Sequence, residues 1–148
     1  MSARKQFSTF WVERLFFGVE VDQVQEVIRY QQITRVPLAP GVVSGLINLR
    51  GHIVTALDLR KRLDLNPRPA DQQPMNVVIR TDGEAVSLLV DEIGDVLEVS
   101  DDAFETPPES LQGKTKDLIS GVYKLDGVIL HVLDTNKAAS NVEISREL

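Results

Sequence analysis

The composition of this 148-residue chain excludes several classes of protein, because 43% hydrophobic and 26% charged residues are typical of a globular domain with a core. The lack of cysteine excludes disulfides, thiolate metal sites and a cysteine nucleophile. The net charge of −6 and the pI near 4.9 argue against a broad surface for nucleic acid or anionic membrane, since that attraction requires clustered Lys and Arg.

The N-terminal segment argues against a secretory signal, because Glu13 and Arg14 break its apolar run. Nowhere does an apolar run approach the ~18 residues that span a bilayer. Together with the lack of cysteine, these features predict a cytoplasmic protein without direct membrane insertion.

Short strands are predicted along most of the chain, since β-branched and aromatic runs are bounded by Gly, Pro, Asp and Asn. A short helix is predicted over 59–65, a proline-rich connector over 66–74 and a weak terminal helix over 136–148. The pattern therefore predicts an all-β fold. Its expected strands are residues 6–12, 15–21, 25–36, 45–49, 52–57, 76–80, 85–90, 94–99, 119–124 and 128–133.

The chain also repeats itself, because SGLINLRGHIVTALDL (44–59) returns 76 positions later as SGVYKLDGVILHVLDT (120–135). Upstream, VDQVQEVI (21–28) returns 69 positions later as VDEIGDVL (90–97). Two copies, roughly 15–65 and 75–135, are each small enough that a separate core would be marginal. We expect one domain over 1–148, with the first strand and the terminal helix shared or peripheral. A repeated five-stranded unit suits a small closed barrel, which removes exposed sheet edges.

Residues that could carry catalysis form no recognisable set. His52 and His131 lie in predicted hairpin strands without metal-ligand spacing, and we expect surface or hydrogen-bonded roles for them. Asp58 and Asp134 recur at corresponding strand ends, where capping explains them better than a catalytic carboxylate pair. The basic run 60–62 is interpreted as the solvated face of a helical turn. The sequence therefore favours binding over catalysis, with no metal and no cofactor.

Arg50 is the position at which the two copies differ most in charge, because Arg50-Gly51 at one predicted hairpin tip corresponds to Asp126-Gly127 at the other. Glycine accepts the positive φ of a tight turn. Since the second copy carries an acid there, folding does not require the arginine, whose planar charge suits recognition of a carboxylate or carbonyl on a partner. The alternative is that Arg50 solubilises the tip or pairs with an acid of its own fold.

Several apolar residues could serve either binding or packing. Trp11 is either an interface anchor or a half-buried strand residue. A second group could line a groove between the copies, although core packing is the usual role of such residues. This group consists of Val24, Val27 and Ile28 with their counterparts Ile93, Val96 and Leu97.

The run LFFGVEVDQVQEVIRYQQITRVPLAPGVVSGLINLRGHIVTALDL resembles the CheW family of chemotaxis coupling proteins, whose pattern combines V-x-E-V, a proline-containing loop and a G-x-x-N-L-R-G hairpin ending in D-L. The likeness continues through VSLLVDEIGDVLEV and LISGVYKLDGVILHVLD and covers nearly the whole chain. It implies two intertwined five-stranded β-barrels, similar to SH3 barrels, with short helices and a shared apolar interior.

The resemblance also implies a non-catalytic adaptor that couples chemoreceptors to a CheA-type histidine kinase at cytoplasmic receptor arrays near the inner membrane. One barrel would engage the kinase regulatory domain, and a groove between the barrels would receive the helical tip of a methyl-accepting chemoreceptor. The family's partner-contact positions fall on Val24, Glu26 and Arg50, and Gly45 and Gly51 would set the hairpin geometry.

Two alternatives remain open. The adaptor could act in a pilus pathway or in another non-flagellar output. A small-barrel binder of ligand or nucleic acid would need a basic, aromatic face, which the acidic composition with 5% aromatic residues does not offer.

Overall fold

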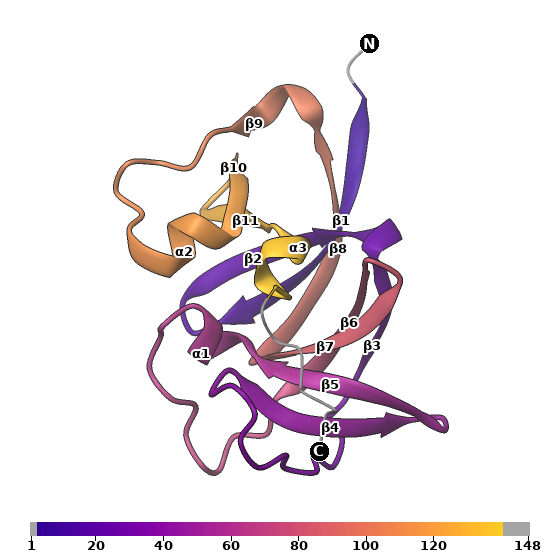
Figure 1. Cartoon of the computed structure of the whole chain (residues 1–148). Helices are drawn as coiled ribbons and strands as arrows, with labels where there is room; N and C mark the ends of the chain where they lie inside the picture. The colour runs from indigo at the N-terminus through magenta and orange to yellow at the C-terminus, as the bar shows by residue number, and fades with distance from the viewer. Residues whose placement is uncertain (1–2, 141–148) are drawn as a thin grey trace.

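The computed structural model of the chain describes residues 3–140. Most of these residues lie in strands, with a few short helices in the connections (Figure 1). The helical turns are η1 (Val21–Gln23), α1 (Leu59–Arg62), η2 (Asp101–Ala103), α2 (Gly113–Leu118) and α3 (Thr135–Ala138). The strands are β1 (Arg4–Val12), β2 (Leu15–Glu20), β3 (Val24–Ile28), β4 (Val43–Leu49), β5 (His52–Asp58), β6 (Met75–Thr81), β7 (Glu84–Val90), β8 (Glu92–Ser100), β9 (Phe104–Glu105), β10 (Ile119–Leu125) and β11 (Val128–Leu133). The predicted all-β class is confirmed.

The strands form two interwoven sheets. The six-stranded sheet has the order β8-β1-β2-β11-β10-β9, and the five-stranded sheet has the order β3-β6-β7-β5-β4. The hairpin β1–β2 therefore joins strands from the end of the chain, pairing antiparallel with β8 and parallel with β11 (Figure 1). The hairpin β6–β7 completes the sheet of the earlier strands β3, β4 and β5. The five-stranded sheet is built from the consecutive strands β3 to β7, whereas the six-stranded sheet combines the first two strands of the chain with the last four.

The two sheets repeat each other strand by strand. In order, β3, β6, β7, β5 and β4 of one sheet correspond to β8, β1, β2, β11 and β10 of the other. The hairpins β6–β7 and β1–β2 both close in two residues, between Thr81 and Glu84 and between Val12 and Leu15, again 69 positions apart. The sequence repeat is thus a repeat of barrel-like units, to which the two-residue strand β9 is added on one side.

The apolar core has a shared centre and two local parts. The central cluster contains Phe10 and Phe17 of the six-stranded sheet together with Leu57 and Leu88 of the five-stranded sheet. A second cluster around Ile47 lies within the five-stranded sheet alone, and a third lies within the six-stranded sheet. Because the central cluster draws on both sheets, each sheet would expose part of its apolar surface if the other were removed.

Helical turns follow the last strand of each repeat because an aspartate caps them. Asp58 Oδ1 accepts a hydrogen bond of 3.0 Å from the Arg60 N–H, and Asp134 Oδ1 accepts one of 3.1 Å from the Lys137 N–H. The predicted capping role of both aspartates is confirmed. The first helix is shorter than the predicted 59–65, because Asp64 takes a φ of 59° just after its end.

Two local predictions were wrong, and a third is tested only at its first residues. The strand expected over 25–36 ends at Ile28, and the loop after it keeps only an isolated bridge between Thr34 and Leu46. Pro37 and Pro40 of this loop lack the N–H that a ladder requires. Strand β9 and helix α2 lie between the predicted strands 94–99 and 119–124, where no strand or helix was predicted. Of the predicted terminal helix, α3 covers the beginning, and 141–148 lie outside the described residues.

Candidate functional site

The tip of the β4–β5 hairpin presents Arg50 to solvent. Leu49 pairs with His52, so the turn consists of Arg50 and Gly51 alone, with φ values of 53° and 87°. Positive φ at both positions characterises the type I′ turn that matches the twist of two strands. The Asn48 side chain supports the turn by accepting a 2.9 Å hydrogen bond from the Gly51 N–H. The corresponding Asp126 does not adopt a positive φ, so the two tips are equivalent in position but not in backbone conformation.

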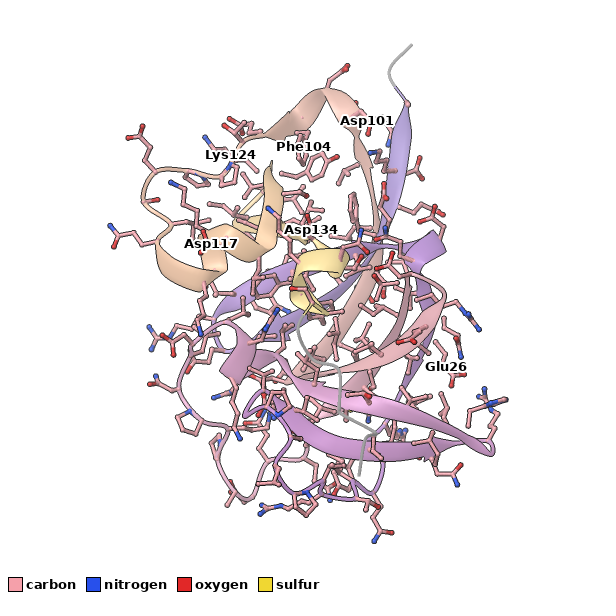
Figure 2. The ribbon with its side chains drawn as sticks, in the orientation of Figure 1. Glu26, Asp101, Phe104, Asp117, Lys124 and Asp134 are labelled. Atoms are coloured by element: carbon pink, nitrogen blue, oxygen red, sulfur yellow. The ribbon has the colours of Figure 1, made fainter. Side chains whose placement is uncertain are left out.

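Glu26 lies within reach of this tip although it belongs to another strand (Figure 2). Arg50 Nη1 and Glu26 Oε2 are 2.7 Å apart, and the arginine side chain is 71% exposed whereas the glutamate side chain is 17% exposed. Strands β3 and β4 stand at opposite ends of the sheet order, so the ion pair links the two ends and helps to close the barrel. Glu26 Oε1 is buried and finds no hydrogen-bond donor among residues 3–140.

The other predicted site residues have different surroundings. Val24 is partly buried and packs against the central cluster. Gly45 lies near the start of β4, away from the tip, where the pairing register with β5 shifts. Its φ is 151°, and a Cβ atom there would lie 2.2 Å from the carbonyl oxygen of Thr34. Gly51 belongs to the tip itself, where a Cβ would meet no atom of residues 3–140 within 4 Å.

A cavity of about 590 Å³ lies beside the tip, between the β4–β5 hairpin and the β6–β7 turn. Its lining mixes charges of both signs with apolar atoms. Ile53 stands out because a large apolar side chain there is 63% exposed. The lining residues that distinguish this cavity are Gln25, Arg50, His52, Ile53, Arg80 and Glu84.

The six-stranded sheet carries an equivalent cavity of about 530 Å³ beside the β10–β11 tip. Leu125 and Ile129 take the places of Leu49 and Ile53, since both pairs are 76 positions apart. The charges differ, because Arg14 and Lys124 line this second cavity without an acidic side chain. The repeat therefore produces two cavities of similar shape and different chemistry, so each is suited to a different partner surface.

A buried ion cluster that sequence reasoning missed lies at the point where the chain passes from β7 to β8. The carboxylate of Asp91 accepts hydrogen bonds from Arg60, whose Nε lies 3.0 Å from Oδ1 and whose Nη2 lies 2.7 Å from Oδ2. Arg68 Nε donates to Oδ1 at 2.9 Å, and the Glu13 N–H donates to Oδ2 at 2.6 Å. Burial alone would raise the pKa of Asp91, but these hydrogen bonds outweigh it and hold that pKa below its usual value. The same contact with Asp91 raises the pKa of Arg60.

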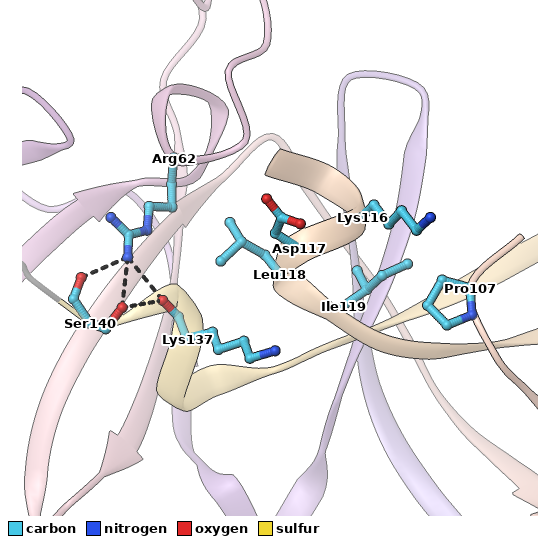
Figure 3. A pocket seen from close by; sticks show the side chains of 8 residues that line it. All are labelled: Arg62, Pro107, Lys116, Asp117, Leu118, Ile119, Lys137 and Ser140. Carbon is cyan, nitrogen blue, oxygen red and sulfur yellow. Dashed lines mark hydrogen bonds between the residues drawn. The ribbon is translucent and has the colours of Figure 1, made fainter. Parts of the chain in front are cut away.

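The interpretation of 60–62 as a solvated face was therefore wrong for two of its residues. Arg60 is buried against Asp91. Arg62 reaches the end of α3, where Nη2 donates to the carbonyl oxygens of Lys137 and Ser140 at 2.9 and 2.6 Å, beside a cavity of about 520 Å³ (Figure 3). The mistake has a physical reason, because the acid that buries Arg60 lies 31 positions later in the sequence.

The two histidines take structural or solvent-exposed positions. His131 is buried, with Nδ1 2.9 Å from the Phe16 carbonyl oxygen, and His52 is exposed, so both take the roles predicted for them. Within 3–140, no group of three or more His, Cys, Asp or Glu side chains could hold a metal ion. In the same part of the chain, no helix has the length and apolar character to cross a membrane.

Comparison with known proteins places these features in a family. The model of the CheW-like domain matches residues 6–143. Chemotaxis protein CheW of Bacillus subtilis (strain 168) is 32% identical over 127 residues, covering 86% of this chain and 81% of that protein. Chemotaxis protein CheW of Thermotoga maritima is 30% identical over 146 residues, covering 96% and 93%. The crystal structure of the scaffolding protein TtCheW from Thermoanaerobacter tengcongensis superposes with a TM-score of 0.80 at 25% identity, covering 88% of this chain and 89% of that one. The chain belongs to the CheW-like domain family.

Proposed function

We propose that this protein is a non-catalytic adaptor that couples chemoreceptors to a CheA-type histidine kinase. The family assignment supports a scaffolding role, since similar proteins are named for chemotaxis and for scaffolding. The observation that carries the proposal is the exposed Arg50 beside the 590 Å³ cavity, held by Glu26 at the end of one barrel. We call this region, formed by Arg50, Glu26 and the cavity, the tip surface. Apolar atoms of the cavity can contact a partner there, and the fixed charges of Arg50 and Glu26 can orient that partner.

The regulatory domain of the kinase is the proposed partner of the tip surface. Arg50 keeps most of its side chain exposed while it pairs with Glu26, so its remaining N–H groups are free to donate to a partner. Glu26 Oε1 has an unused acceptor position that a donor from the partner would satisfy. Val24 lies in β3 with Glu26 and would hold this strand in place by packing against the central apolar cluster. The helical tip of a methyl-accepting chemoreceptor would occupy a groove between the two barrels, in the cytoplasm at receptor arrays.

Binding assays with purified proteins test this function. The protein should bind the regulatory domain of a CheA-type kinase and a chemoreceptor cytoplasmic fragment, and it should bind both together. Parallel titrations with RNA and with nucleotides should show no binding. Binding to RNA or nucleotide alone would overturn the adaptor function and favour a small-barrel ligand binder.

A further inference from the structure

We propose that Asp91 is a positioning residue that holds the two barrels at one fixed angle. This inference goes beyond the adaptor function, because it concerns the geometry between the two barrels and does not depend on which partners bind them. It rests on the connectivity of the buried ion cluster, on the repeat and on the nature of the core between the sheets.

Asp91 contacts the six-stranded sheet through backbone groups of that sheet. The Asp91 N–H donates to the Trp11 carbonyl oxygen at 2.9 Å, and the Glu13 N–H donates to the Asp91 carboxylate at 2.6 Å. Trp11 lies near the end of β1, and Glu13 lies in the β1–β2 turn with a φ of 54°. The end of this hairpin is therefore tied to Asp91 at two points, one at its backbone N–H and one at its carboxylate.

The contacts of Asp91 to the other barrel are made through arginine side chains. Arg60 lies in α1, directly after β5, and Arg68 lies in the connector that leads to β6. Arg60 Nη1 also donates to the carbonyl oxygens of Asn66 and Pro67 at 3.2 Å each, which fixes the connector to α1. A single carboxylate thus receives donors from both barrels at once.

The repeat shows that the buried ion cluster is specific to one of the two crossings between the sheets. The counterpart of Asp91, 69 positions earlier, is Asp22, which lies exposed in η1. The counterpart of Arg60, 76 positions later, is Asn136, whose side chain accepts a hydrogen bond from Thr81. Asp22 stands where the chain passes from β2 of the six-stranded sheet to β3 of the five-stranded sheet, which is the equivalent crossing between the barrels. The ion cluster therefore forms at only one of the two crossings, and that crossing is the one at which charged contacts can fix the angle between the barrels.

The central apolar cluster does not by itself specify an angle. Apolar burial is nondirectional and depends mainly on the area removed from water. The Asp91 contacts are short, charge-assisted and directional, and both oxygens of the carboxylate are used. Rotating one barrel against the other would leave a buried charge without its donors, which is far more costly than sliding one apolar surface over another.

Distance measurements between spin labels test the proposal directly, because the chain has no native cysteine to interfere. One labelled pair, Glu84→Cys with Asp126→Cys, spans the two barrels at exposed positions. A second pair, Asp95→Cys with Asp126→Cys, lies within the six-stranded sheet and reports on the integrity of that sheet alone. We expect a single narrow distance for both pairs in the otherwise unchanged protein.

Asp91→Asn removes the charge while keeping the size of the side chain. It should broaden the distance distribution between the barrels and leave the distribution within the six-stranded sheet narrow. The control Glu105→Gln removes an exposed ion pair with Lys124 inside the six-stranded sheet and should leave both distributions unchanged. If Asp91→Asn does not fold, Arg68→Gln, which removes one of the two arginines, decides the question by the same measurement. An unchanged distribution between the barrels in a folded variant of either kind would overturn the proposal, as would equal broadening of both labelled pairs.

Discussion

Arg50 and Glu26 come from opposite ends of the five-stranded sheet order, yet their side chains form an ion pair of 2.7 Å. The sequence left open the alternative that Arg50 pairs with an acid of its own fold. The structure confirms this pairing. Because the arginine remains 71% exposed, this pairing leaves room for recognition of a partner as well. The contributions of Arg50 to the stability of the fold and to partner binding can be measured separately by substitution.

Arg50→Asp should weaken partner binding more than it weakens the fold. The arginine side of the ion pair is open to solvent, which weakens the pair, and aspartate tolerates the positive φ of this turn, so we expect a loss of about 1 kcal/mol in unfolding free energy. Binding to the kinase regulatory domain should lose about 2–5 kcal/mol if the contact is desolvated in the complex. Thermal or urea unfolding and calorimetric titration of the same variant measure both quantities.

Asp126→Arg is the matched control, since it makes the reverse charge change at the equivalent tip of the other barrel. It should leave kinase binding unchanged. The double exchange Glu26→Arg with Arg50→Glu should restore the ion pair and the stability without restoring binding. Normal binding by Arg50→Asp would remove Arg50 from the partner site, and restored binding by the double exchange would mean that the pair acts only through the fold.

Gly45→Ala should destabilise the protein far more than the same substitution at Gly51 or Gly41. A Cβ atom at this position would lie 2.2 Å from the Thr34 carbonyl oxygen on a backbone with φ of 151°, so strand and loop would have to move apart, at a cost of about 3 kcal/mol. Gly51→Ala meets no neighbour and should lose only about 1 kcal/mol through its positive φ. Gly41→Ala meets no neighbour either and serves as a neutral control in the same unfolding experiments. Equal losses for all three variants would contradict this account.

Acid should destabilise the protein partly through Asp91. Its pKa in the folded protein lies below the usual value, so the unfolded chain binds more protons in the interval between the two values, and stability rises with pH there. The contribution is fully present above about pH 4, near the pKa of an unfolded aspartate, and is lost as the pH falls through the folded pKa. Urea unfolding between about pH 5 and about pH 2 should therefore show a shallower pH dependence for Asp91→Asn than for the unchanged protein. Parallel curves for the two proteins would show that Asp91 is not the titrating group.

The interwoven sheets predict that the chain is one folding unit. A fragment of residues 1–66 would contain β1–β2 without β8 and β11, and β3–β5 without β6–β7. Its apolar surfaces would be exposed, so we expect an aggregated or poorly ordered product. Size-exclusion chromatography and thermal melting followed by circular dichroism check this outcome. A monomeric fragment that melts cooperatively would show that the first half folds alone.

The sequence predicted the features that depend on local pattern and on the repeat. The all-β class, the resemblance to the CheW family and the capping by Asp58 and Asp134 are confirmed. Contacts between distant segments could not be predicted, because alternation of apolar residues says nothing about which strand is the neighbour. The burial of Arg60 by Asp91 and the pairing of β2 with β11 are both of this kind. The partner-contact roles of Val24, Glu26 and Arg50 stay predictions.

The placement of the β1–β2 hairpin sets an order of events during synthesis of the protein. This hairpin leaves the ribosome before the other strands, but its neighbours β8 and β11 are translated only after all five strands of the other sheet. A nascent chain can therefore complete the five-stranded sheet early. The apolar side chains of the β1–β2 hairpin, such as Phe10 and Phe17, stay exposed to solvent until β8 and β11 have been synthesised. Because the closing contacts join segments far apart in the chain, this last docking step is expected to be the slow one and the one most dependent on chaperones.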